Sequence, residues 1–230
     1  MSAGNPSLRP QHAWNYDLLV EHFLPSLGGM ISGGAFYKHL TDFILSKQFI
    51  YTGPYAPFDG YYGTEPANGG AGHVAGVEVE WIQHFAFLPG ALAGLGVDLN
   101  WTHTSSQALV DTATGRQAPL LRQAPDIANA TLTYDRGVVS ARVAWTYNGA
   151  NIASYGDGSA TANGDNYFYA HSQIDASAIL TLQPRVQLQL QALNLNNAVF
   201  GFFNGTPDHA YSLQREYYGQ TFYFGVKYGF

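Results

Sequence analysis

The C-terminal segment of the chain carries the pattern that most restricts its fold. From Thr221 to Phe230, apolar residues alternate with polar or small ones at every position. Side chains of a β-strand point alternately to its two faces, so one face of this strand is apolar along its whole length. A half-buried strand of a soluble sandwich can show the same alternation, but such strands seldom end a chain on an aromatic residue. The segment therefore favours a strand with one face in lipid.

The same alternation recurs along the rest of the chain. From Val186 to Gln191, one face holds only Val and Leu and the other only Gln. Further alternating segments are residues 14–24, 75–85, 95–102, 128–134, 139–148 and 168–182, while Met30–Phe43 shows the pattern weakly because Gly and Ala occupy both faces. These segments predict an all-β fold, an antiparallel transmembrane β-barrel segment of about nine or ten meandering strands, most of them near the roughly 9–11 residues that a tilted strand needs to cross a bilayer.

The connections between these strands alternate between short and long. Tight turns are expected at residues 25–28, 89–90, 135–137 and 183–185, and long polar or aromatic loops at 46–72, 104–124, 149–167 and 197–217. Outer-membrane barrels have short periplasmic turns and longer extracellular loops. The connections therefore indicate the same fold independently, and they orient it, because the strand that ends at Phe230 must descend towards the periplasm.

Composition agrees with a membrane barrel. Charged residues make up only 11% of the chain and aromatic residues 15%, yet the mean hydropathy is -0.11. A barrel strand exposes one face to lipid and one to a polar lumen, so its average hydropathy is close to neutral. No segment approaches the roughly 20 apolar residues of a membrane-spanning helix. If the chain spans a bilayer without such a helix, it must do so as a closed sheet.

Several other functions are disfavoured by the residues present. The chain has no cysteine, which excludes disulfides and thiolate metal sites, and its net charge of -6 argues against nucleic acid as a partner. Residues 1–6 have neither the basic nor the apolar region of an export signal. Because an outer-membrane protein must be exported, we expect the true N-terminal part of the protein to be missing from this sequence.

No catalytic or metal-binding group stands out. His171 and Asp175 share a strand face, but no nucleophile is singled out beside them, so we interpret them as polar residues of the lumen. His73, His84, Glu78 and Glu80 are too far apart for one ion, because each residue advances a strand by about 3.3 Å. We therefore expect no enzyme activity, no metal and no cofactor.

The long loops are the candidate ligand-binding regions. They are rich in tyrosine and phenylalanine, whose rings can stack on sugars or on aromatic chelators, although packing between loops is the simpler role. The candidate residues are Tyr51, Tyr55, Tyr61, Tyr62, Tyr155, Phe202, Phe203 and His209.

At five places the sequence resembles the TonB-dependent outer-membrane receptors. Residues 4–11, GNPSLRPQ, are similar to the family's N-P-x-L-x-P-E motif, with Gln11 in place of Glu. Residues 34–44, GAFYKHLTDFI, resemble the strand ending F-Y-K-x-x-x-D-F-I. Residues 175–177, DAS, and 192–197, ALNLNN, resemble the signatures D-A-S and N-L-x-N/D. Residues 218–230 resemble the closing strand Y-G-R-T-F-x-x-G-V-x-Y-x-F, with Gln220 in place of Arg.

The resemblance implies a fold, a location and a set of partners. In this family a barrel of about 22 strands encloses an N-terminal plug, and the receptor imports a scarce nutrient such as an iron chelate, cobalamin or an oligosaccharide. Residues 1–230 would be the C-terminal part of that barrel in the outer membrane, without plug or front half, and inactive without them. The implied partners are outer-membrane lipid, the barrel assembly machinery through Phe230, the TonB system through the missing plug, and a small nutrient.

Closure of the sheet is the remaining structural question. An odd number of strands leaves a seam, since single-chain bacterial barrels have an even number. Residues 46–62 can supply a further strand, making a small self-standing porin or outer-membrane enzyme the alternative reading. The prolines at 54 and 57 each remove a backbone donor, so we favour an open half-barrel with edges near residues 14–24 and 221–230.

Overall fold

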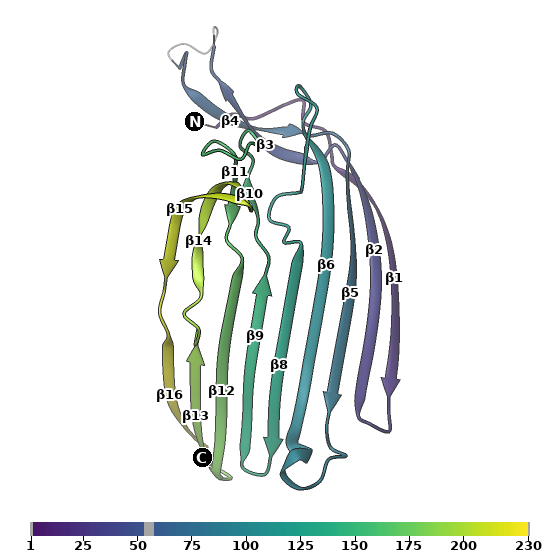
Figure 1. Ribbon diagram of the computed structural model, residues 1–230, viewed down its shortest axis with the longest axis vertical. Helices are drawn as coiled ribbons and strands as arrows, with labels where there is room; N and C mark the ends of the chain where they lie inside the picture. Colours follow the sequence, from purple (N-terminus) through teal and green to yellow (C-terminus); the bar gives the residue numbers. More distant parts are fainter. Residues whose placement is uncertain (1, 53–57, 230) are drawn as a thin grey trace. The chain divides into compact units, whose positions relative to one another are not determined.

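The computed structural model describes residues 2–52 and 58–229, and its strands are shown in Figure 1. Tyr55, the prolines at 54 and 57, and Phe230 lie outside the described residues. The main sheet is an antiparallel meander that begins at β1 and ends at β16. Its strands are β1 (His12–Leu24), β2 (Gly29–Thr41), β5 (Gly72–His84), β6 (Leu95–Asp111), β8 (Asp126–Arg136), β9 (Val139–Asn148), β12 (His171–Gln183), β13 (Val186–Leu193) and β16 (Thr221–Tyr228), in that spatial order, with β7 (Arg116–Ala118) paired to β6.

The predicted fold class is confirmed, and the sheet is open. Among the described residues, β1 pairs only with β2, and β16 only with β13, so these two strands are the edges of the sheet. The possible extra strand within residues 46–62 does not join it. β3 (Ile44–Ile50) pairs instead with β4 (Tyr62–Asn68) in a separate two-stranded sheet.

Two compact units share these strands. Unit 1 comprises Met1–Asp17, Phe36–Ala75 and Ser105–Leu120, and unit 2 comprises Leu18–Ala35, Gly76–Thr104 and Leu121–Phe230. Unit 2 holds the four connections predicted as tight turns, which lie together at its lower end in Figure 1. Two of them, at residues 137–138 and 184–185, are tight two-residue turns as predicted, and Gly137 has the positive φ (59°) that such hairpins need. The connection at 85–94 is longer than predicted and contains one short 3-10 helix, Gly90–Gly94.

Cross-strand register in unit 2 places the predicted apolar residues on one continuous face. Residues directly opposite in neighbouring strands point to the same face. Leu190 is opposite Phe224 and Leu188 is opposite Val226, whereas Gln187 is opposite Lys227. The same apolar face continues across β6, β8, β9 and β12 through Val97, Leu132, Val143 and Ala176. We call this the apolar face, and the face that carries Gln187, Gln189 and Asp98 the polar face.

The predicted long loops are largely built of strands, which corrects the sequence-based interpretation. Residues 149–167 and 197–217 contain β10 (Asn151–Ser154), β11 (Asp165–Phe168), β14 (Val199–Thr206) and β15 (His209–Tyr217). These pair in the order β10-β11-β14-β15, which repeats the order β9-β12-β13-β16 of the strands they adjoin in the chain. The four-stranded sheet, here called the extension sheet, therefore continues four strands of the main sheet beyond a short break in each (Figure 1).

Asparagine side chains replace the missing ladder hydrogen bonds at the break between β13 and β14. The Asn194 side chain donates to the Gly219 carbonyl (2.8 Å) and accepts from the Ala198 N–H (2.6 Å). Asp175 accepts from the Asn194 N–H (2.7 Å), and Gln220 donates to the Leu195 carbonyl (2.6 Å). Asn194 has a φ of 57°, a conformation that asparagine tolerates better than most residues. Three of the sequence signatures, at 175–177, 192–197 and 218–220, therefore meet in this break.

A second break, in unit 1, brings the other two signatures together. Asp42, which directly follows β2 and has a φ of 54°, forms an ion pair with Arg9 (2.5 Å). Asn68 donates to the Asp42 carbonyl (2.8 Å) and accepts from the Arg9 N–H (2.8 Å). Gln11 accepts from the Ile44 N–H (3.4 Å), so the amide keeps the acceptor of the carboxylate it replaces. At each break, the residue that departs from the family pattern, Gln220 or Gln11, forms a hydrogen bond to the backbone.

Candidate ligand-binding surface

The polar face of the main sheet in unit 2 carries a ladder of hydrogen-bonded side chains. Asn129 donates to Asn100 (2.8 Å), and Arg142 donates to the hydroxyl of Thr131 (3.2 Å), which is opposite Asp98. One carboxylate oxygen of Asp98 is buried and has no hydrogen-bond partner. This face is therefore suited to contact with water or with another polar surface.

His171 and Asp175 belong to the same ladder and do not touch each other. Gln173 lies between them, donating to both oxygens of Asp175 (2.9 and 3.1 Å) and facing Nε2 of His171 (3.3 Å). The other ring nitrogen of His171 lies 3.0 Å from the Val199 carbonyl. The arrangement is a polar network along one strand face, and it positions no nucleophile.

The polar face continues onto the extension sheet, where it becomes aromatic. His171 is on the polar face and is opposite Asn148, while Phe168, three positions earlier, is opposite Asn151. Residues an odd number of positions apart point to opposite faces of a strand. Phe168 is therefore on the apolar face, and Tyr167 and Tyr169 are on the polar face. The ring of Tyr167 stacks on Phe203 with a centroid distance of 5.1 Å and an interplanar angle of 7°.

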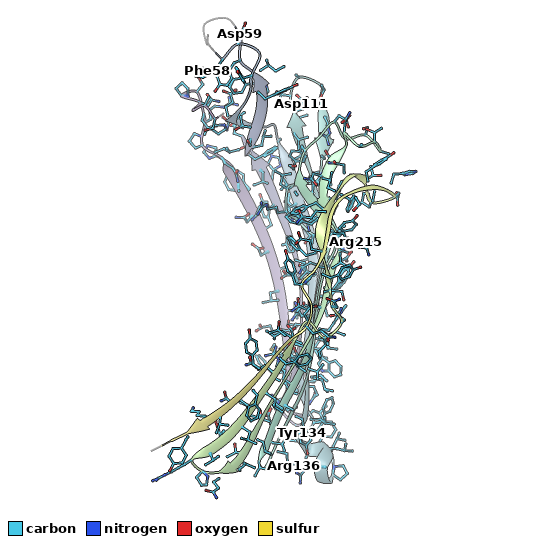
Figure 2. All side chains as sticks on the ribbon, turned by 90° about the vertical axis from the view of Figure 1, so that its left-hand side faces the viewer. Phe58, Asp59, Asp111, Tyr134, Arg136 and Arg215 are labelled. Carbon is cyan, nitrogen blue, oxygen red and sulfur yellow. The ribbon has the colours of Figure 1, made fainter. Side chains whose placement is uncertain are left out.

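Tyr169 and Arg215 complete this group of side chains. The ring of Tyr169 lies 4.9 Å from that of Phe203, and the guanidinium of Arg215, labelled in Figure 2, lies 5.8 Å above Tyr169. Tyr167, Tyr169, Phe203 and Arg215 are here called the aromatic cluster. Sequence reasoning missed Tyr167 and Tyr169, although they continue the odd-numbered face of His171, Gln173 and Asp175.

The predicted ligand residues in unit 2 do not form one site. Phe203 is in the aromatic cluster, but its neighbour Phe202 points to the opposite face, where it contacts Phe168 (4.7 Å). Phe202 and Phe203 therefore cannot bind the same ligand. Tyr155 follows β10 directly and is half-buried, and His209 is exposed where β15 begins, next to the β14–β15 turn.

Of the predicted ligand residues in unit 1, the described ones, Tyr51, Tyr61 and Tyr62, lie on the β3–β4 hairpin or in its connection. Tyr51 is buried, with rings of Phe49 at 4.7 Å and Phe58 at 6.1 Å, so it packs within the hairpin. Tyr61 and Tyr62 are 58% and 72% exposed and are the two that offer surface to a ligand.

Groups that would indicate other chemistry are absent from the part of the chain that the structure describes. It contains no cluster of three or more His, Cys, Asp or Glu side chains placed to hold a metal ion. No helix among residues 2–52 and 58–229 is long and apolar enough to cross a membrane.

An antiparallel sheet with one apolar and one polar face is the architecture of transmembrane β-barrels, and here the sheet is an open part of one. Residues 1–198 match the family of TonB-dependent receptor-like β-barrels. The match covers most of the chain, so the chain belongs to this family of outer-membrane transport receptors. No curated protein is a significant match.

Solved structures of receptors share the fold. A variant of the ferric enterobactin receptor of Pseudomonas aeruginosa, bound to enterobactin, matches with a TM-score of 0.66 and 17% identity over 99% of this chain and 32% of its own. The ferric yersiniabactin uptake receptor of Yersinia pestis matches with a TM-score of 0.63 and 17% identity over 96% and 30%. The copper transporter OprC matches with a TM-score of 0.65 and 16% identity over 98% and 33%. The chain thus spans about a third of the length of these structures.

Proposed function

We propose that residues 1–230 form the C-terminal part of the barrel of a receptor that takes up a scarce nutrient across the outer membrane. Membership of the receptor family supports this role, and the meeting of its signatures at the two strand breaks adds to it. A plug and further strands would complete the receptor, and the plug would couple it to the TonB system.

The aromatic cluster is the surface that we assign to the nutrient. It lies on the polar face, where the half-buried rings of Tyr167 and Tyr169 rest on the buried ring of Phe203 and lie beside one exposed cation, Arg215. Aromatic faces bind flat or ring-containing molecules, and a guanidinium binds carboxylate or phenolate oxygens. This chemistry favours a ring-containing metal chelate over cobalamin or an oligosaccharide, and solved relatives include receptors for ferric chelates.

A pair of adjacent substitutions tests this assignment. Tyr169→Ala should weaken binding of a ferric catecholate chelate to a receptor carrying this segment about tenfold, because it removes a ring and the support of Arg215. Phe168→Ala, which removes a neighbouring ring from the opposite face, should leave binding unchanged. Equal effects of the two substitutions in a titration followed by fluorescence quenching would contradict the assignment.

A further inference from the structure

The apolar face of the extension sheet bears an exposed aromatic patch that the proposed receptor function does not use. The rings of Phe168, Phe200 and Phe202 lie together, with centroid distances of 4.7 Å (Phe168 to Phe202), 5.6 Å (Phe200 to Phe202) and 6.4 Å (Phe168 to Phe200). Tyr218 adds a fourth ring, 6.0 Å from Phe200, and is 70% exposed. We call these four residues the outer patch.

The outer patch continues the surface that faces lipid. Phe222 is opposite Ala192 on the apolar face, and Tyr218 and Glu216 have the same parity along the chain. In register, Glu216 is opposite Phe200 and Gln214 is opposite Phe202. One side of β15 and β16 therefore passes from Gln214 and Glu216, through Tyr218, to Phe222, Phe224 and Val226. This change from polar to aromatic to aliphatic side chains is typical of a boundary between water and hydrocarbon.

Charged groups lie at two sides of the outer patch. The guanidinium of Arg122 lies 5.8 Å above the ring of Phe168, and among the described residues it forms no ion pair. On the other side, the Glu216 carboxylate accepts hydrogen bonds from Gln214 (2.6 Å) and from the hydroxyl of Tyr218. The patch lies across β11, β14 and β15, a width of roughly 10 Å at the usual strand spacing.

We propose that the outer patch binds the phosphorylated sugar headgroup of a glycolipid in the outer leaflet. Aromatic rings pack against the apolar faces of sugars, carboxylate and amide groups bond their hydroxyls, and arginine binds phosphate through two parallel hydrogen bonds. The outer patch is continuous with the apolar face at Phe222, Phe224 and Val226, against which acyl chains would lie. The proposed ligand is therefore a membrane-anchored molecule. The proposal rests on the outer-membrane location and is independent of which nutrient is transported.

Glycolipid retention provides the test. A receptor carrying this segment is reconstituted in phosphatidylcholine vesicles that contain equal minor fractions of a bis-phosphorylated diglucosamine glycolipid and of phosphatidylglycerol. After detergent extraction, the lipids that remain bound are quantified by mass spectrometry. We expect the glycolipid to be enriched several-fold over phosphatidylglycerol. Equal retention of both lipids would overturn the proposal, since it would show attraction to any anionic lipid.

Matched variants locate the site. Arg122→Asn removes the charge, and asparagine tolerates the positive φ of 57° at this position. This substitution and Phe202→Leu should each abolish most of the glycolipid enrichment. Arg136→Asn, an equal charge change at the opposite end of β8 (Figure 2), and Tyr169→Ala, on the polar face, should leave it intact. Unchanged glycolipid enrichment in Arg122→Asn would refute the site. Binding of free glucosamine phosphate in detergent that equals binding of the glycolipid would refute an anchored ligand. Faster migration of unheated than of heated protein on gels confirms that no variant has simply unfolded.

Discussion

At the scale of the residue, the face to which each side chain points is set by strand parity and by cross-strand register. Leu190 and Gln189 are adjacent, yet Leu190 lies opposite Phe224 and Gln189 opposite Gly225, on different faces of β13. A one-residue change in register would exchange their environments completely. The two positions are therefore a sensitive pair for any substitution that lipid and water treat differently.

Arginine substitutions at this pair should differ strongly. Leu190→Arg should destabilise the folded chain in vesicles by about 2–4 kcal/mol, because a charge near the bilayer midplane loses its hydration. Gln189→Arg should cost far less, since the polar face is in contact with water or with a polar surface. Urea titrations of refolding measure both values, and similar losses for the two variants would show that the faces are wrongly assigned.

The contact between Glu216 and Tyr218 makes a pH-dependent prediction. Hydrogen bonds from Tyr218 and Gln214 lower the pKa of Glu216 below its ordinary 4.5, and the Glu216 carboxylate raises the pKa of Tyr218 above 10.0. The stabilisation from the pair is therefore fully present between pH 4.5 and pH 10.0, and it is lost as pH falls through the folded pKa of Glu216 or rises through that of Tyr218. In an NMR titration of ring-labelled tyrosine, Tyr218 should titrate above pH 10.0 and at lower pH in Glu216→Gln. An identical midpoint in the variant would exclude the contact.

At the scale of the element, the strand breaks explain what the sequence signatures do in this chain. The break at residues 194–198 is stabilised by side chains that bond backbone groups left unpaired by the ladder. A buried backbone group without a partner costs about 1–3 kcal/mol, so these side chains are needed wherever a strand is interrupted. Asn194 thus has a local structural role at this break.

Substitution of Asn194 tests this role. Asn194→Ala removes two hydrogen bonds and places alanine at a φ of 57°, so it should destabilise the chain by about 2–3 kcal/mol. Asn194→Gly should cost less, because glycine adopts this φ without strain. Asn100→Ala, which removes one bond to Asn129, serves as the control and should cost about 1 kcal/mol. A chemical-denaturation series with Asn194→Ala no worse than the control would contradict the account.

The strands of the main sheet could be predicted from the sequence, whereas those of the extension sheet could not. β13 alternates Leu with Gln, as expected of a strand with one face in lipid and the other not. β14 has the sequence VFGFFNGT and β15 has HAYSLQREY, with aromatic or polar residues on both faces, so neither shows the period of two. Beyond the bilayer, water can lie on either face, and the alternation is no longer required. Because β14 could not be recognised as a strand from the sequence, the sequence did not show that Phe202 and Phe203 point to opposite faces.

At the scale of the whole molecule, the open edges of the sheet require a partner for their backbone. Strands β1 and β16 each pair on one side only, and unpaired backbone groups cost several kcal/mol each in lipid. This disfavours the alternative of a small self-standing porin or enzyme and agrees with a segment of a larger barrel.

The terminal residue leads to a prediction for assembly in the cell. The barrel assembly machinery is expected to recognise the final aromatic residue, Phe230, so its deletion from a receptor carrying this segment should reduce insertion into the outer membrane more than folding in detergent. Surface labelling and a gel-shift assay of refolded protein measure these two quantities. Undiminished surface display of the deletion would refute the role of Phe230.

The central claim, that one face of each strand lies in lipid and the other does not, has a direct test because the chain contains no cysteine. Single cysteines introduced in turn at residues 187–190 and 223–226 carry spin labels without background, and the chain is reconstituted in lipid vesicles. Collision of each label with oxygen, which concentrates in lipid, is compared with collision with a water-soluble nickel complex. The account predicts opposite, period-two oscillations of the two accessibilities, with oxygen highest at 188, 190, 224 and 226 and nickel highest at 187, 189, 223 and 225. Accessibilities that rise and fall together, or that lack the period of two, would contradict it.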